Sequence, residues 1–310
     1  MSIILKRSLM LLKIPSVFLS VIGSSFLIWI FLTTALPQII LKYGEYDQWK
    51  VNSHLSITSP SPVAIEDSTV YFLIGHPDDE VMFFSPSIIE LSKKRHNNKV
   101  RLLCLSSGDA ESEMMGAIRR DELYKSARIL GIEKQDVILA GGFKDGMDIV
   151  WHEEDIKRIL QSNVNDSKKK EVLVTFDEKG VSKHPNHMSL YHGAKSFLVS
   201  QKDNRELSLY VLKSLSFWEK YSWTFVTNVE LFVNHISDLI IRKIFNVKIN
   251  ISIASLHQER HSFKIYSDLS MFSLSLAAMM YGHHSQMTWF RYGWLLMSRY
   301  LTFNNLILKC

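Results

Sequence analysis

The chain has 310 residues, of which 46% are hydrophobic and 22% charged, and its mean hydropathy is +0.02. The composition excludes a disordered protein, because the apolar fraction is ample for a core, and two cysteines are too few for a disulfide scaffold or a cysteine-rich zinc module. Most of the net charge of +5 comes from residues 1–42, which carry +4. No basic face therefore indicates binding to nucleic acid.

An uncharged run of 28 residues extends from Ile14 to Leu41. A helix needs about 20 apolar residues to cross the hydrocarbon core of a bilayer, at about 1.5 Å per residue. A cleaved signal peptide is the alternative, because basic residues precede the run, but the run exceeds the usual ~7–15 apolar residues. We predict a membrane anchor over residues 1–42 with a transmembrane helix at about 15–36, then a linker at 43–68 and a soluble domain at 69–310. The C-terminal region of this domain is rich in aromatic residues and arginine, and we expect it to lie close to the membrane.

The charges that flank the anchor bear on its orientation. The basic residues lie on its N-terminal side, and by the positive-inside rule this sends the rest of the chain out of the cytosol. Two glycosylation sequons, at Asn165 and Asn250, are compatible with that side of the membrane.

Beyond residue 68, short apolar runs alternate with helical patterns. We expect strands at 70–74, 100–105, 137–140, 172–176 and 209–212, and helices around 81–94, 114–130, 156–160 and 188–199. This alternation predicts an α/β fold with a Rossmann-like, mostly parallel sheet and helices on both faces. An uncharged run at 269–281 is too short to span a bilayer, so it is either a core helix or a surface that dips into the membrane interface.

Two segments carry residues suited to metal chemistry. The first, Gly75 to Glu80, follows the most apolar strand and contains His76, Asp78 and Asp79. The second, His184-Pro185-Asn186-His187, follows the strand at 172–176. Each alone could be an ordinary helix N-terminus or a loop, but the carboxyl ends of parallel strands bring distant ligands together. Two histidines and one carboxylate with an open position form a coherent catalytic metal site.

These residues resemble a known family. The pentapeptide His76–Glu80 together with His184-x-x-His187 is similar to the LmbE-like zinc-dependent N-deacetylases. The segments 119–123, 130–132, 284–291 and 298–300 are similar to the N-acetylglucosaminyl-phosphatidylinositol de-N-acetylases (PIG-L type) within that group. The resemblance covers roughly residues 66–300, and it departs at Lys183, where these enzymes usually have glycine.

The resemblance implies a role for each matching position. It implies that zinc, or another divalent ion, is bound by His76, Asp79 and His187. It makes Asp78 the general base and His184 the general acid or the stabiliser of the oxyanion, and it gives Arg119 a part in substrate binding.

Three further positions carry expectations from the residues themselves. Asp109 follows another strand, so it either lines the sugar pocket or belongs to an ordinary turn. Arg291 lies among aromatic residues, so it either binds a phosphoinositide head group or snorkels from a core helix. His283 is expected to be structural or to face substrate rather than to bind the metal.

The implied activity is removal of the acetyl group from N-acetylglucosaminyl-phosphatidylinositol, the second step of glycosylphosphatidylinositol anchor synthesis. The partners would be the phosphatidylinositol glycolipid and the bilayer. The family implies a single-pass protein of the endoplasmic reticulum with a cytosolic catalytic domain, against the flanking charges. The alternatives are a deacetylase of a soluble N-acetylglucosamine conjugate and a membrane-tethered binding protein without catalysis.

Overall fold

The computed structural model describes residues 3–43, 65–110, 112–164, 169–201, 206–233 and 262–309. Residues 44–64, which form most of the predicted linker, lie outside the described residues, as do both sequons, at Asn165 and Asn250.

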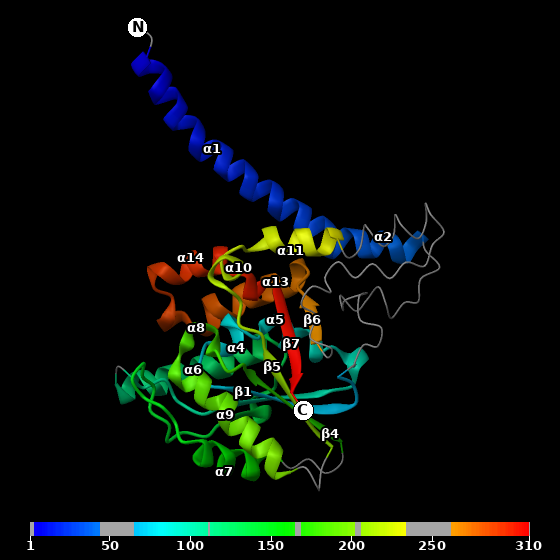
Figure 1. The fold of residues 1–310 in the computed structure, drawn as a ribbon, viewed down its shortest axis with the longest axis vertical. Coiled ribbons are helices and arrows are strands. Elements are labelled where there is room, and N and C mark those ends of the chain that lie inside the picture. Colours follow the sequence, from blue (N-terminus) through cyan, green and yellow to red (C-terminus); the bar gives the residue numbers. More distant parts are fainter. Residues whose placement is uncertain are drawn as a thin grey trace.

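A seven-stranded sheet in the order β3-β2-β1-β4-β5-β7-β6 forms the centre of the domain (Figure 1). Its strands are β1 (Ser68–Ile74), β2 (Lys99–Cys104), β3 (Val137–Leu139), β4 (Lys170–Phe176), β5 (Leu207–Leu212), β6 (Ser262–Tyr266) and β7 (Phe303–Lys309). The first five strands are parallel, and β7 is antiparallel to both of its neighbours. Every residue of β1 is buried, as in a strand covered on both faces. The prediction of a mostly parallel sheet is confirmed.

Helices cover both faces of the sheet. On one face α7 (Glu153–Asn163) packs on α9 (Pro185–Ser200), which covers β4 and β5. On the other, α5 (Ser85–Leu91) and α6 (Glu113–Ile129) contact α13 (Leu269–Ala277) and the π-helical turn η6 (Ala278–Gly282) that continues it. Met271 and Phe272 of α13 are buried, so the run at 269–281 packs as a core helix on that side.

Two features differ from the sequence prediction. The helix expected at 81–94 is split into α4 (Asp79–Met82) and α5, because Pro86 lies in the first turn of α5 and cannot continue a helix from α4. Strands β6 and β7 were not predicted. The remaining helices are α2 (Leu36–Tyr43), α8 (Gly180–Lys183), α10 (Phe217–Lys220), α11 (Thr224–Leu231) and α14 (Trp289–Met297), with short turns η1 (Phe31–Ala35), η2 (Lys94–His96), η3 (Lys134–Asp136), η7 (His284–Gln286) and η8 (Arg299–Leu301).

The N-terminal helix α1 (Ile3–Ile30) projects from the domain, and only its C-terminal part packs against it (Figure 1). Trp29 is fully buried beside Phe272, and Phe26 stacks on Trp223 with ring centroids 5.2 Å apart. By length and composition the segment Leu19–Ile39 is able to cross a membrane. The predicted apolar helix is therefore present, and it is packed onto the α/β domain rather than joined to it by a linker alone.

Candidate active site

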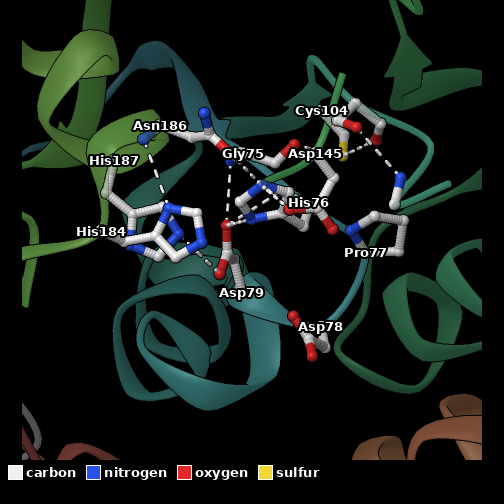
Figure 2. Close-up of polar contacts among 12 residues, drawn as sticks. Gly75, His76, Pro77, Asp78, Asp79, Cys104, Asp145, His184, Asn186 and His187 are labelled. Atoms are coloured by element: carbon white, nitrogen blue, oxygen red, sulfur yellow. Dashed lines mark hydrogen bonds and ion pairs between the residues drawn. The ribbon is translucent and has the colours of Figure 1, made fainter. Parts of the chain in front are cut away.

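The two predicted loops meet at the topological switch point of the sheet, between β1 and β4. From β1 the chain continues to one edge of the sheet through β2 and β3, and from β4 it continues towards the other edge. The loop at 75–78 follows β1 and the loop at 177–184 follows β4, and these strands are neighbours. A crevice at such a switch point is where open α/β sheets bind ligands. Figure 2 shows His76, Asp79, His184 and His187 gathered at this point.

Asp79 is the residue around which the site is organised. One carboxylate oxygen, Oδ2, accepts the backbone N–H groups of Gly75 at 2.9 Å and of His76 at 3.0 Å. The other, Oδ1, lies 3.2 Å from Nε2 of His187. A Cβ atom at Gly75 would stand 3.3 Å from both Asp79 and His187, so glycine leaves room for the two side chains to approach. The Asp79 carboxylate is thereby held in place before any ligand binds.

His187 presents a free ring nitrogen to Asp79. Its Nδ1 lies 3.3 Å from the carbonyl oxygen of Gly180, which can only accept, so Nδ1 carries the proton. Nε2 is buried and has no hydrogen-bond partner among the described residues. Phe176 stacks on the imidazole with ring centroids 3.9 Å apart and an interplanar angle of 3°. An unprotonated nitrogen that faces a carboxylate needs a cation between them, which is what a metal ion supplies.

His76 completes a ligand set. Its Nε2 lies 3.1 Å from Oδ1 of Asp145 and 3.0 Å from Oδ1 of Asn186, so this nitrogen donates and Nδ1 is left to face Asp79 at 3.6 Å. The ligand atoms of His76, Asp79 and His187 lie within 4.8 Å of one another, and all three residues are buried. This set fits a divalent ion with an open position. A second set, His76, Asp145 and His184, shares one ligand and is less buried.

The charges of the site favour a cation. Burial lowers the pKa of His76, but the carboxylates of Asp145 and Asp79 outweigh it and raise that pKa to about 10. Burial raises the pKa of Asp79, but His187 and His76 outweigh it and hold that pKa well below its usual range. A proton or a metal ion satisfies the same carboxylates, so metal binding is coupled to proton release.

Asp78 lies beside this cluster. Figure 2 shows its carboxylate set apart from the side chains of His76, Asp79, His184 and His187. Its backbone φ is 124°, which side-chain-bearing residues rarely adopt. Its Oδ2 accepts a hydrogen bond from Nη2 of Arg291 at 2.7 Å and lies 3.9 Å from Nη2 of Arg119. Burial raises the pKa of Asp78, and the two arginines oppose that rise. A raised pKa makes this carboxylate a better proton acceptor than an ordinary aspartate.

The structure brings two of the three predicted substrate-binding residues to the site. Arg119, on α6, donates from Nη1 to the carbonyl of Gly108 at 2.9 Å and from Nη2 to that of Pro77 at 2.9 Å. Arg291 reaches Asp78 from α14. Asp109 is half-buried beyond β2, and among the described residues it forms no hydrogen bond or ion pair with the cluster. Their roles in substrate binding stay predictions.

His184 is the N-cap residue of α9. Its Nδ1 accepts the backbone N–H of Asn186 at 3.3 Å, so the ring proton resides on Nε2. Burial and the neighbouring His187 and His76 lower the pKa of His184 to about 4, so the ring is neutral at pH 7. Lys183, just before it, has a φ of 59°, a left-handed conformation that favours glycine.

Sequence reasoning missed Asp145 and the role of Glu80. Asp145 follows β3, so its position after a predicted parallel strand was the available signal. Glu80 is fully buried, and its Oε2 accepts the backbone N–H of Asp78 at 3.0 Å. His283 is fully buried and contacts Oε1 of Glu80 rather than the ligand set, as expected for a structural residue.

Comparison with known proteins identifies relatives of this chain. Residues 71–198 match the family model PIG-L, described as GlcNAc-PI de-N-acetylase. An N-acetylglucosaminyl-phosphatidylinositol de-N-acetylase of Arthroderma benhamiae is 30% identical over 81% of this chain and 92% of its own length. The protein of that name from Saccharomyces cerevisiae is 31% identical over 77% of this chain and 80% of its own.

Among solved structures, a deacetylase of the teicoplanin biosynthetic pathway aligns with 78% of this chain and 98% of its own, at 12% identity and a TM-score of 0.48. The two curated relatives match most of their own length as well as most of this chain. The chain therefore belongs to the N-acetylglucosaminyl-phosphatidylinositol de-N-acetylase (PIG-L) family.

Proposed function

We propose that this protein hydrolyses the N-acetyl group of N-acetylglucosaminyl-phosphatidylinositol, releasing acetate and glucosaminyl-phosphatidylinositol, in the second step of glycosylphosphatidylinositol anchor synthesis. The observation that carries the proposal is the buried set His76, Asp79 and His187 beside Asp78. The names of the curated relatives support the substrate. The proposal places the protein in the endoplasmic reticulum membrane, with its catalytic domain in the cytosol.

His76, Asp79 and His187 would hold the ion, which we propose is zinc. When bound there, a zinc ion supplies a Lewis acid for the amide carbonyl and makes water acidic enough to react near pH 7. Asp78 takes the proton of the attacking water, and Arg291 holds the carboxylate in place for that transfer.

His184 stabilises the negative charge that develops on the amide oxygen. A general acid would need a protonated ring, but the lowered pKa of His184 favours the neutral form, whose Nε2–H is the available donor. Asp78, once protonated, returns its proton to the leaving amine. The water, the amide bond and the two products balance without a covalent intermediate on the protein.

Acetate release from the glycolipid by detergent-solubilised protein tests this proposal. We expect release to stop with a chelator, to return with zinc, and to fall by about 10²–10⁴-fold in Asp78→Asn. Asp148→Asn is the matched control, because Asp148 is exposed outside the cluster. Folded, zinc-loaded wild type that releases no acetate from the glycolipid would contradict the proposed substrate, and full activity in Asp78→Asn would contradict the proposed base.

A further inference from the structure

Helix α11 buries Leu231 but turns other apolar side chains outward. Thr224 and Thr227 are buried, whereas Phe225, Val229 and Phe232, which follow one stripe of the helix and its C-cap, are exposed. A surface helix of a soluble domain normally turns its apolar stripe to the core. The outward stripe of α11 therefore faces something other than water.

Polar contacts hold the inner side of α11. Glu230 pairs with Arg299 at 2.7 Å, and the Arg299 side chain is only 1% exposed. The side-chain amide of Asn228 donates to the carbonyl of Ser25 in α1 at 2.8 Å. These contacts fix the orientation of the helix, so the exposure of its apolar stripe is a property of the packed domain.

Helices α14 and α10 expose apolar side chains as well. Trp289 is 86% exposed, Trp218 is 82% exposed and Leu296 is 62% exposed. The exposed side chains of α14 are uncharged: Trp289, Phe290, Tyr292, Leu296 and Met297. Large aromatic residues of this kind gather where a protein meets the interface of a bilayer.

The three helices form one surface with α1, here termed the apolar face. Phe26 of α1 stacks on Trp223 at the start of α11, and the backbone N–H of Trp223 donates to the carbonyl of Met297 at the end of α14 at 3.1 Å. Figure 1 shows α10, α11 and α14 on the side of the domain from which α1 projects. The apolar face is therefore continuous with the helix that is able to cross a membrane.

The position of the contact between α1 and α11 along the apolar run bears on how deep the domain lies in the membrane. The uncharged run of α1 begins at Ile14, and Ser25 joins it to α11, because the Ser25 hydroxyl lies 2.8 Å from that of Thr224. The intervening 11 residues cover about 16 Å, half of the ~30 Å hydrocarbon core. If a span of about 20 residues starts at Ile14, Ser25 lies about 12 Å inside the membrane.

We propose that the apolar face is embedded in one leaflet of the bilayer. The catalytic domain is then partly inserted in the membrane, rather than held near it by the N-terminal helix alone. The depth of about 12 Å is a little greater than the roughly 5–10 Å at which interfacial helices lie in the boundary of head groups and acyl chains. A groove of about 560 Å³ between α1 and α11, lined by Val21, Ile28 and Phe225 among others, lies along this surface, and acyl chains of the leaflet fill it.

The depth of single labelled side chains tests the insertion. We choose Leu296→Cys on the apolar face and Val199→Cys on α9 as its matched control, because these side chains are 62% and 56% exposed. Each carries a nitroxide in the full chain, with Cys310 replaced by serine and the buried Cys104 retained, in phosphatidylcholine–phosphatidylinositol vesicles. Collisions with oxygen and with a water-soluble nickel complex then report the depth.

In the vesicles, we expect the label at 296 to be less accessible to the nickel complex and more accessible to oxygen than the label at 199. The label at 199 represents a side chain exposed to buffer. Trp218→Cys should behave like Leu296→Cys. Equal nickel accessibility at 296, 218 and 199 would overturn the insertion. Because this measurement needs no turnover, the insertion stands or falls independently of the proposed substrate.

Discussion

The buried contact between Glu80 and His283 gives the sharpest test of how the C-terminal segment supports the site. Both side chains are fully buried. Oε1 of Glu80 contacts Nε2 of His283 and accepts a hydrogen bond from Ser126 at 2.5 Å, while Oε2 accepts the backbone N–H of Asp78 at 3.0 Å. Burial lowers the pKa of His283, but Glu80 outweighs it and raises that pKa, so the two form an ion pair.

Replacing His283 by leucine leaves the carboxylate of Glu80 buried without its cation. Removal of one partner from a buried ion pair costs about 3–5 kcal/mol. We expect the free energy of unfolding of His283→Leu, measured by urea titration of tryptophan fluorescence in detergent, to fall by that amount. His284→Leu is the control, because His284 is exposed and substitutions at such positions stay within about 0.5 kcal/mol.

The double variant Glu80→Leu/His283→Leu separates the pair from its surroundings. With both charges gone, the loss in unfolding free energy should be smaller than the sum of the two single losses. Acetate release by the double variant should be lower than that of the wild type even if its stability recovers. The backbone N–H of Asp78, a residue with a strained φ of 124°, has then lost its acceptor on Glu80. Equal stability of His283→Leu and His284→Leu, or strictly additive losses, would refute the ion pair as the support of the loop.

Two further predictions concern stability at low pH and the space around Arg119. Burial raises the pKa of Glu90, but a hydrogen bond from His96 and nearby cations outweigh it and lower that pKa from 4.5 to about 2. Its stabilisation of about 3 kcal/mol is present above pH 4.5 and is lost as the pH falls towards 2. The free energy of unfolding of Glu90→Gln, measured by urea titration, should therefore fall less between pH 4.5 and 2 than that of the wild type. An equal fall in the two proteins would contradict this. Gly108 and Gly141 have φ values of 68° and 69°, so alanine should cost each about 1–2 kcal/mol. Only at Gly108 would a Cβ lie 2.5 Å from Arg119, so only Gly108→Ala should also lose acetate release.

The sequence allowed the sheet and the meeting of the two histidine-bearing loops to be predicted, because both depend on short segments. A buried strand followed at once by His76, Asp78 and Asp79 places those residues at the end of the strand whatever the rest of the chain does. The segment from His184 to His187 follows β4 in the same way. Neighbouring parallel strands then bring the two loops together without further information.

Other parts of the site depend on contacts that leave no local pattern. Arg291 and Asp78 are 213 residues apart, and the sequence around Arg291 is equally suited to a head-group site or a core helix. The packing of α1 on the domain through Trp29 could not be predicted from the sequence either. An apolar helix has the same composition whether lipid or protein surrounds it. Asp145 lies in a loop whose conformation is set by its neighbours rather than by its own residues.

Helix α14 carries both exposed apolar side chains and Arg291, which contacts the proposed base Asp78. Trp289 and Phe290 lie on the exposed apolar face, while Arg291, the next residue, turns inward to the carboxylate of Asp78 at 2.7 Å. Because successive helical residues point about 100° apart, a helix of nine residues can serve both surfaces only if its axis lies along the rim of the site. A glycolipid whose acyl chains stay in the leaflet would then present its sugar beside Asp78 without leaving the membrane. The proposed insertion of the apolar face and the position of the proposed base, Asp78, would then both depend on the same helix.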